Sequence, residues 1–312
     1  MSKKVTVSVI MITYNQAAYI EEAINGIIIQ DCDFNVELII ANDYSPDKTD
    51  EIVKELLLRL IIPPNIKLKY INHNVNKLPN PNYLWALGEA QGKYIANCEG
   101  DDYWTDPSKL QKQVDFLENN PEYAACFTNI DLLRDGQIYP AVLKEKHKQN
   151  FDAKTILDGF WIPTLTVIFR AESLPKPLPK QFHKVANGDV FLFHILAQAG
   201  KIGYLDFVSG VYRQHTEGVW TGSNLIDQIN KRIMTLELLK DYFKVELGMV
   251  KVFDNHIMNN RRRMVEYYWK NRKMRLLINE YIRFSKEYPL DSYRLLFSNI
   301  MKKILKIYNT NN

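Results

Sequence analysis

The sequence is poor in cysteine and has no long apolar run. Its three cysteines are odd in number and show neither a CxxC pair nor a Cys/His ligand spacing. A disulfide framework and a zinc site are therefore not expected, and buried reduced thiols are the simplest interpretation. No stretch is apolar over the length that a membrane-spanning helix needs. We expect a cytoplasmic protein.

Glycine and proline are not abundant either, at 13 each among 312 residues, and no segment has low complexity or an internal repeat. These features exclude collagen-like and disordered classes. A hydrophobic content of 46% suffices for one large domain, or for a domain with an appendage. The first 15 residues contain an apolar run, but it alternates and lacks a small-residue cleavage site, so it predicts a strand rather than a signal peptide.

Positive charge is concentrated at the carboxyl end. From Leu225 onward the chain has 18 Lys and Arg against 9 Asp and Glu, whereas residues 1–224 have 22 against 27. An acidic body with a basic tail favours an anionic partner for the tail, although a solvated basic helix face explains the same pattern. No nucleic-acid partner is expected.

β-rich and helical stretches alternate through residues 5–105. We predict strands at 5–13, 36–41, 66–71 and 93–98, and helices near 20–28, 52–60 and 83–90. Asn15 is the expected N-cap of the first helix. This order predicts an α/β fold, in which a mostly parallel sheet carries helices on both faces.

The rest of the chain is less regular. A helix is expected to begin at Asp106-Pro107, because proline suits the first helical position. We also predict strands at 123–133, 164–170 and 201–207, a turn at 135–136, a helix at 190–199 and a polar loop at 215–223. The pattern is helical from Leu225 to the end, which indicates one domain at 1–224 and a helical region at 225–312.

Polar residues follow the predicted strands at one edge of the sheet, where open sheets of this type bind ligands. They are Thr13, Tyr14 and Asn15 after the first strand, Asn42 and Asp43 after the second, and Glu99, Asp101 and Asp102 after the fourth.

The last of these groups concentrates negative charge. Crowded carboxylates raise one another's pKa unless a cation is present. Oxygen ligands without cysteine or paired histidine nearby favour Mg²⁺ or Mn²⁺, which commonly bridges carboxylates to substrate phosphates. Acidic residues also occur at helix N-termini because they interact favourably with the helix dipole. This explains Asp106 well, but it explains Glu99 and Asp101 poorly.

Four segments carry a family resemblance. They are VSVIMITYN, LIIANDYSPDKT, GKYIANCEGDDYWTDPSKLQKQVDFLE and NGDVFLFHILAQAGKIGYLDFVSGVYRQHTEGVW. The first three resemble the nucleotide-sugar-binding half of family 2 glycosyltransferases with the A-type (GT-A) fold, here residues 1–105. The fourth resembles the acceptor half, here 106–224. The resemblance covers about residues 5–222, and four ordered blocks are more specific than one DxD pattern.

The resemblance implies roles for residues after the first two strands. Tyr14 would stack on the nucleobase and Asp43 would accept a hydrogen bond from the base, with Thr13 and Asn15 beside them in the nucleotide-sugar site. Asn42 stands where many relatives have the first Asp of a pair, which puts the base contacts in doubt.

The resemblance also implies a metal site. Asp101 would bind Mn²⁺ or Mg²⁺, Glu99 would contact ribose or a metal-bound water, and Asp102 would add charge or fix the loop. Glu99 itself departs from the first Asp of the usual DxD. His215 stands where several such enzymes place a further metal ligand, and an ordinary surface or core histidine is the alternative.

In the acceptor half, Asp189 matches the family's general base. A carboxylate there would remove the proton from an acceptor hydroxyl as it attacks the anomeric carbon, and a single displacement inverts that centre. A plain helix N-cap is the alternative for Asp189. Trp220 is a candidate acceptor or donor contact, although a tryptophan is more often a core or rim residue.

These features predict a metal-dependent inverting glycosyltransferase. It would move one sugar from a nucleotide-sugar donor, taken as UDP-linked, to a hydroxyl of a glycan or lipid-linked acceptor in bacterial surface-polysaccharide synthesis. The QxxRW signature of processive synthases is missing, which favours transfer of a single sugar.

Two other functions stay open. One is a catalytically inactive nucleotide-sugar-binding module. The other is a sugar-nucleotide pyrophosphorylase, which needs a Gly-rich basic loop that TYNQAAYIEE lacks. An NAD enzyme is disfavoured because no GxGxxG follows a strand. The C-terminal helices would either pack on the body or in a homodimer, or lie peripherally on an anionic membrane.

Overall fold

The computed structural model describes residues 4–216, 218 and 222–291. The chain separates into two compact units, Met1–Gly222 and Ser223–Asn312.

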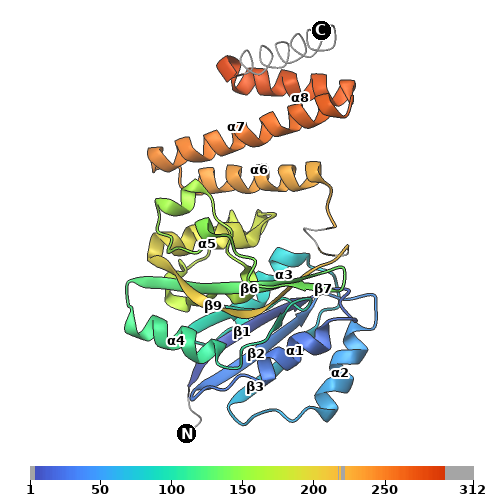
Figure 1. Ribbon diagram of the computed structural model, residues 1–312, viewed down its shortest axis with the longest axis vertical. Helices are drawn as coiled ribbons and strands as arrows, with labels where there is room; N and C mark the ends of the chain where they lie inside the picture. Colours follow the sequence, from blue (N-terminus) through green and yellow to red (C-terminus); the bar gives the residue numbers. More distant parts are fainter. Residues whose placement is uncertain (1–3, 217, 219–221, 292–312) are drawn as a thin grey trace. The chain divides into compact units, whose positions relative to one another are not determined.

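A nine-stranded sheet organises the first unit (Figure 1). Its strands are β1 (Val5–Thr13), β2 (Asn35–Asn42), β3 (Ile66–Asn72), β4 (Tyr94–Asn97), β5 (Tyr103–Trp104), β6 (Tyr123–Arg134), β7 (Gln137–Tyr139), β8 (Ile168–Arg170) and β9 (Lys201–Gln214). Their order is β3-β2-β1-β4-β8-β6-β9-β5, with β7 paired to β6.

The direction of the strands decides where their ends meet. β3, β2, β1 and β4 are mutually parallel, β8 runs antiparallel to both β4 and β6, and β9 is parallel to β6. Strands β1, β2, β4, β6 and β9 therefore share one direction. Their carboxyl ends lie at one edge of the sheet, which is where ligands bind in folds of this type.

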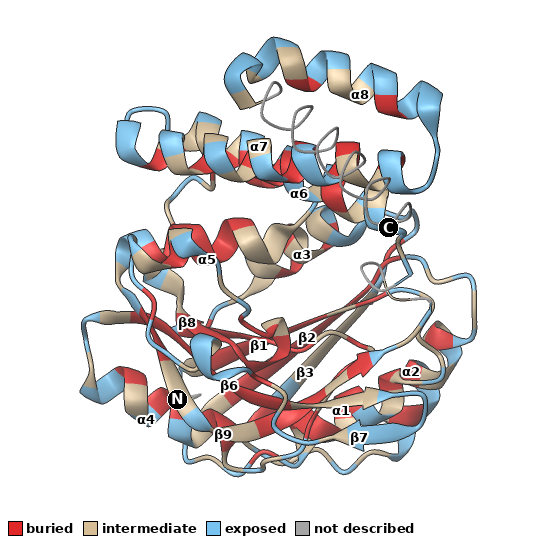
Figure 2. Cartoon of the chain, turned by 45° about the horizontal axis from the view of Figure 1, so that its top comes forward, coloured by how far each residue is buried: buried red, intermediate tan, exposed pale blue. Residues whose placement is uncertain are grey.

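Helices cover both faces of this sheet (Figure 1). α1 (Ile20–Ile28), α2 (Thr49–Arg59) and α4 (Lys109–Asn119) lie on one face, and α3 (Pro79–Glu89) and α5 (Gly188–Ala199) lie on the other. Short 3₁₀ turns occur at Glu145–His147, Thr155–Asp158, Thr164–Thr166, Ala171–Ser173 and Phe182–Lys184. Buried residues run along β1, β2 and β8 between the two helical layers (Figure 2).

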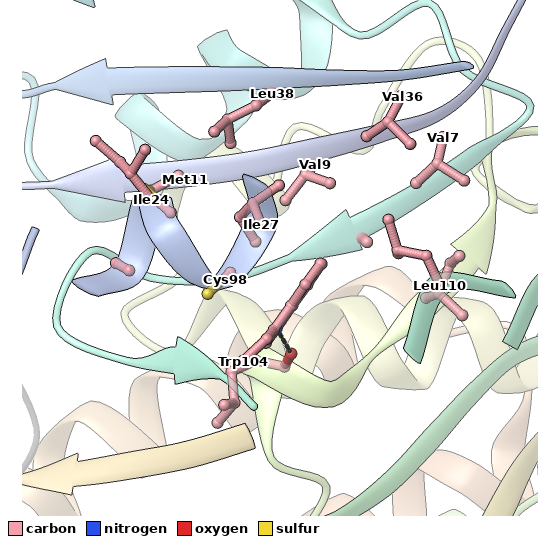
Figure 3. Close-up of a cluster of buried hydrophobic side chains, with 14 of the residues drawn as sticks. Val7, Val9, Met11, Ile24, Ile27, Val36, Leu38, Cys98, Trp104 and Leu110 are labelled. Carbon is pink, nitrogen blue, oxygen red and sulfur yellow. Dashed lines mark hydrogen bonds between the residues drawn. The ribbon is translucent and has the colours of Figure 1, made fainter. Parts of the chain in front are cut away.

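The main core lies between the sheet and α1, α2 and α4. Val7, Val9 and Met11 project from alternate positions of β1 onto Ile24 and Ile27 of α1 (Figure 3). The buried Trp104 completes this layer, and its indole N–H donates to the Leu165 carbonyl at 2.7 Å. Cys98 points into the same layer, so the residues on either side of it face the other way.

The predicted α/β fold class is confirmed, and the strands and helices of residues 5–98 lie close to their predicted positions. The prediction that Asn15 caps the first helix is wrong, because Asn15 has a positive φ of 57° and α1 begins only at Ile20. The helix expected at Asp106-Pro107 begins at Lys109, after Asp106 Oδ1 has accepted a hydrogen bond from the Ser108 amide.

Three further differences lie in the second half. Residues 164–166 form a 3₁₀ turn rather than a strand, and β8 begins at Ile168. β9 continues seven residues past the predicted end at Phe207. The two-residue β5 and the three-residue β7 were not predicted, because both are too short to show a periodicity of their own. β5 pairs with β9, which is distant in sequence, and β7 pairs with β6 across a tight turn.

The second unit contains α6 (Leu225–Tyr242), α7 (Leu247–Lys270) and α8 (Met274–Glu287). Arg261, whose side chain is 3% exposed, forms ion pairs with Glu237 of α6 and with Glu280 and Glu287 of α8. One buried guanidinium thus links all three helices. Within the described residues, we find no helix that combines the length and the apolar character required to span a bilayer.

Candidate active site

The candidate residues of the first unit collect where β1, β2, β4 and β9 end. Thr13 and Asn42 are the last residues of β1 and β2, Asn97 is the last of β4, and His215 follows the last residue of β9. The four strands share one direction, so residues as far apart in sequence as Thr13 and His215 reach one edge of the sheet.

The loop after β2 satisfies its polar groups internally. Asn42 is fully buried, and its Oδ1 accepts hydrogen bonds from the Ser45 amide and hydroxyl, at 3.1 and 2.6 Å. Asp47 Oδ1 accepts from the Thr49 amide and hydroxyl, at 3.1 and 2.6 Å. Asn42 therefore organises this loop, which gives a structural role to the residue that departs from the family pattern.

The same loop holds the turn after β1. The amides of Asn15, Gln16 and Ala17 donate to Ser45 Oγ, Thr49 Oγ1 and Asp47 Oδ2, at 3.0, 3.0 and 2.9 Å. Burial alone would raise the pKa of Asp47, but the hydrogen bonds from Thr49 and Ala17 bring it below its ordinary value. Since these amides already have partners, the turn does not form a phosphate-binding loop.

The residues expected to hold the nucleobase differ in accessibility. Tyr14 is 46% exposed. Asp43 is buried, and its Oδ1 accepts a hydrogen bond from the Lys77 amide at 2.7 Å, which leaves Oδ2 for another donor. Thr13 is 2% exposed, and its hydroxyl is buried without a partner among the described residues.

The segment after β4 buries several carboxylates close together. Burial, then the charge of Asp101, then that of Asp189, raises the pKa of Glu99 to about 8. Burial followed by the charges of Asp101 and Glu99 raises the pKa of Asp102 well above its ordinary value. Gly100 lets the chain pass close to β1, because a Cβ there would lie 2.9 Å from the side chain of Thr13.

Asp101 and His215 meet across the sheet edge. Asp101 Oδ2 lies 3.1 Å from His215 Nε2, so the structure brings together the two residues assigned to the metal. No group of three or more His, Cys, Asp and Glu side chains suited to a metal occurs within the described ranges.

This donor set fits one hard divalent cation. Mg²⁺ is usually held by one or two protein ligands, with substrate phosphates and water completing its coordination. The buried Glu99 Oε2 has no hydrogen-bond partner among the described residues, and the neighbouring carboxylates repel it. Positive charge at this point would relieve that repulsion.

Arg213, next to last in β9, fixes the position of the acidic segment. Its guanidinium donates to the Asp101 carbonyl at 2.7 Å and forms an ion pair with Glu22 of α1. Its backbone amide donates to Asp102 Oδ1 at 2.8 Å, and its guanidinium lies 4.4 Å from the ring centroid of Tyr103. This residue therefore ties α1, β5 and β9 to the segment that carries Asp101.

Asp189 lies in the first turn of α5, on the α3 side of the sheet. The residue before the helix is Asn187, so Asp189 is inside the helix and the N-cap alternative is wrong. Its charge contributes to the raised pKa of Glu99, which places the two carboxylates within electrostatic reach of each other.

Trp220 lies outside the described residues. The sequence analysis did not identify Arg213, although it lies in the fourth segment that carries the family resemblance. A single arginine has no neighbouring sequence pattern that would reveal the four segments it joins. Asn97 and Tyr83, whose hydrogen bond joins β4 to α3 at 3.2 Å, were also missed.

Comparison with known proteins decides the family. The family described as Glycosyl transferase family 2 matches residues 8–171, just over half of the chain, and this range includes the segments that follow β1, β2 and β4. The chain belongs to glycosyl transferase family 2.

Relatives of this family 2 chain include the uncharacterized protein Rv1520 of Mycobacterium tuberculosis. It is 34% identical over 214 residues, which cover 68% of this chain and 60% of that protein. TuaG of Bacillus subtilis, named as a putative teichuronic acid biosynthesis glycosyltransferase, is 34% identical over 134 residues, 43% of this chain and 50% of TuaG. The chain thus spans about half to three fifths of the length of these relatives.

Solved structures share the GT-A fold. TarS 1-349 of S. aureus, in complex with UDP-GlcNAc, aligns with a TM-score of 0.57 at 18% identity, covering 91% of each chain. The mannosyltransferase PcManGT of Pyrobaculum calidifontis, in complex with GDP-Man and Mn²⁺, aligns with a TM-score of 0.56 at 17% identity, covering 99% of this chain and 83% of that one.

Proposed function

We propose that the protein is a metal-dependent inverting glycosyltransferase that moves one sugar from a nucleotide-sugar donor to a hydroxyl of a glycan or lipid-linked acceptor. The observation that carries this proposal is the buried acidic segment after β4. Burial and the charge of Asp101 raise the pKa of both Glu99 and Asp102 there, and Asp101 lies beside His215. Such a segment is costly in the free protein and favourable once a cation and a diphosphate occupy it.

Each residue of the site would have a defined task. Asp101 and His215 hold the cation, Asp43 accepts from the nucleobase, and Tyr14 stacks on it. Asp189 accepts the proton of the acceptor hydroxyl while the new C–O bond forms at the anomeric carbon and the bond to the diphosphate breaks on the opposite side. A bound divalent cation would stabilise the negative charge on the departing diphosphate.

The donor and the acceptor are inferred from relatives. TarS was solved with UDP-GlcNAc, and PcManGT with GDP-Man and Mn²⁺. TuaG and a further relative, GgaB, bear names that refer to teichuronic and minor teichoic acid biosynthesis. We therefore propose a UDP-linked sugar as donor and a cell-surface polysaccharide or its lipid-linked precursor as acceptor.

The helical unit would serve the acceptor side. It carries the excess of basic residues found from Leu225 onward. We propose that these helices make peripheral contact with an anionic membrane, and packing on the body or in a homodimer is the alternative. Pelleting with anionic vesicles, compared between the full chain and a chain ending at Gly222, separates the two: vesicle binding lost on truncation supports the membrane contact, and a change in mass alone supports the dimer.

Asp189→Asn tests the proposed chemistry. With UDP-GlcNAc, Mn²⁺ and a polysaccharide-precursor acceptor, we expect turnover to fall by about 10²- to 10⁴-fold. The affinity for UDP-GlcNAc should stay within about twofold, because an amide keeps the shape but cannot take the proton. Unchanged turnover would remove Asp189 from the base role. No transfer by the wild-type protein despite tight donor binding would favour the inactive module.

A further inference from the structure

Tyr19, the residue directly before α1, packs on two side chains at the end of β9. Its ring lies 4.9 Å from the imidazole of His215, centroid to centroid, and the guanidinium of Arg213 lies 5.1 Å from the Tyr19 ring. Both partners also reach Asp101: Arg213 donates to its carbonyl at 2.7 Å, and His215 Nε2 lies 3.1 Å from its Oδ2. One half-buried tyrosine therefore contacts both side chains that connect β9 to Asp101.

The backbone alone does not fix the imidazole of His215. The pairs between β6 and β9 end at Arg134 and Gln214, so His215 is the first residue beyond the ladder. The second side-chain dihedral of a histidine has only a broad preference, and contact with a neighbouring ring restricts it. Because Arg213 and His215 are two residues apart at the end of a strand, their side chains share a face, and Tyr19 packs against that face.

Tyr19 is itself held in place from two sides. Its amide donates to the Gln16 carbonyl at 2.9 Å, and the Gln16 amide donates to Thr49 Oγ1 at 3.0 Å. Glu22, one turn further along the chain, forms an ion pair with Arg213. The turn before α1 thus fixes the tyrosine, and the first turn of α1 is joined to β9 by a second contact.

We propose that Tyr19 is a positioning residue for the cation site: its ring holds the His215 imidazole with Nε2 directed toward Asp101. This inference rests on the proposed function, in which Asp101 and His215 bind Mn²⁺ or Mg²⁺. Replacing a residue that orients a metal ligand commonly lowers metal affinity by roughly 10- to 100-fold. Tyr19 acts through His215, so its role requires no contact with the cation or the nucleotide.

Tyr19→Leu, compared with Tyr19→Phe, is the principal test. Binding of Mn²⁺ to the full chain is measured by the loss of the free Mn²⁺ signal in electron paramagnetic resonance, with UDP, or with GDP if the wild type binds that nucleotide instead. We expect about tenfold weaker Mn²⁺ binding in Tyr19→Leu. Tyr19→Phe keeps the ring and should stay within about twofold of wild type. Wild-type affinity in Tyr19→Leu would overturn the positioning role.

Tyr123→Leu is the matched control for a general loss of packing. Tyr123 makes the same kinds of contact, since its ring lies 4.9 Å from that of Phe116 and the Lys201 ammonium lies 5.7 Å from its centroid. It is the first residue of β6, so it lies at the opposite edge of the sheet from the candidate site. This variant should leave Mn²⁺ affinity unchanged. A loss equal to that of Tyr19→Leu would mean that packing in general, rather than the position of His215, is responsible.

A double-mutant cycle separates action through His215 from action through Arg213. His215→Ala alone should weaken Mn²⁺ binding, and adding Tyr19→Leu to it should weaken binding by no more than about twofold further. A full additional tenfold loss would show that Tyr19 acts elsewhere and would overturn the inference. Unchanged Mn²⁺ affinity in His215→Ala would also overturn it, while leaving the role of Asp101 and the proposed transfer reaction intact.

Tyr19→Met replaces Tyr19→Leu if the leucine variant does not fold, because a flexible thioether fills similar space without a flat ring. The same tenfold loss of Mn²⁺ affinity is expected. Wild-type affinity in the variant without a ring would overturn this inference alone. Absence of any Mn²⁺-dependent nucleotide binding by the wild-type protein would overturn the proposed function together with it.

Discussion

The segments that follow β2 and β4 lie at the same edge of the sheet, but they differ in how far their polar side chains are hydrogen-bonded. After β2, Asn42, Asp47 and their neighbours hydrogen-bond to one another and to the turn after β1. After β4, Glu99 and Asn97 hold buried polar atoms that have no hydrogen-bond partner among the described residues, and burial and the charge of Asp101 raise the pKa of Glu99.

This contrast separates the scaffold from the binding site. The loop after β2 is complete in the free protein, so it presents Tyr14 and Asp43 in fixed positions. The segment after β4 buries carboxylates that raise the pKa of their neighbours, and under the proposed function a ligand that supplies positive charge would stabilise it. Substitutions should therefore destabilise the first region and tend to spare or stabilise the second, except at the residues that hold it in place.

Arg213→Met should have the largest effect on stability. It removes the hydrogen bond to the Asp101 carbonyl, the ion pair with Glu22 and the contact with Tyr103, for an expected loss of about 2–3 kcal/mol in the free energy of unfolding. Urea unfolding measures it. Arg59→Met is the control, since that arginine forms an exposed pair with Glu21, and its loss should cost less than about 1 kcal/mol. Equal losses in the two variants would show that Arg213 fixes nothing.

Asp47→Ala tests the completed loop. The variant loses hydrogen bonds to Ala17 and Thr49, and we expect a loss of about 1–2 kcal/mol by the same measurement. Asp152→Ala is the matched control: Asp152 accepts similar hydrogen bonds from Lys154 and Thr155, all within its own turn. A loss at Asp47 no greater than at Asp152 would contradict the idea that the loop after β2 supports the turn after β1.

Lys109→Met tests whether burial makes the charged form of Lys109 unfavourable in the folded protein. Lys109 is buried over the ring of Trp104, and burial lowers its pKa to about 7. The unfolded chain therefore binds a proton that the folded protein has released between about pH 7 and pH 10.5. The contribution of Lys109 to stability accordingly rises with pH across that window.

The expected result is a pH-dependent difference between variant and wild type. The free energy of unfolding of Lys109→Met relative to wild type should fall by about 2 kcal/mol from pH 7 to pH 9. Lys112→Met, in the same helix but exposed and paired with Asp106, should show no such trend. A parallel pH profile for wild type and Lys109→Met would mean that Lys109 keeps its charge in the folded protein.

Much of the first half could be predicted from the sequence because its determinants are local. β-branched strands and apolar residues at helical spacing fix the elements from Val5 to Asn97, and the strand direction then places Asp43 and Asp101 at one edge. The family resemblance added Asp189 and His215, which no local pattern identifies.

The remainder depended on contacts between distant segments. The N-cap prediction for Asn15 is wrong because the Asn15 amide donates a hydrogen bond to Ser45, thirty residues away, and the backbone of Asn15 is left-handed before α1 begins. The length of β9 depends on pairing with β6, and the roles of Arg213 and Asn97 depend on partners in α1, β5 and α3. Such partners are fixed only by the folded chain.

Thermal unfolding with Mn²⁺ and UDP-GlcNAc, added singly and together, tests the central claim most directly. Under the proposed function, the segment after β4 binds Mn²⁺ and the diphosphate of UDP-GlcNAc together. The two ligands together should therefore raise the midpoint temperature of unfolding of the wild type by on the order of 5 °C, well above the shift from either alone. Asp101→Asn should lose this joint effect. An equal shift from UDP-GlcNAc alone in wild type and Asp101→Asn, with nothing added by Mn²⁺, would contradict the claim that these carboxylates are completed by a cation and a diphosphate.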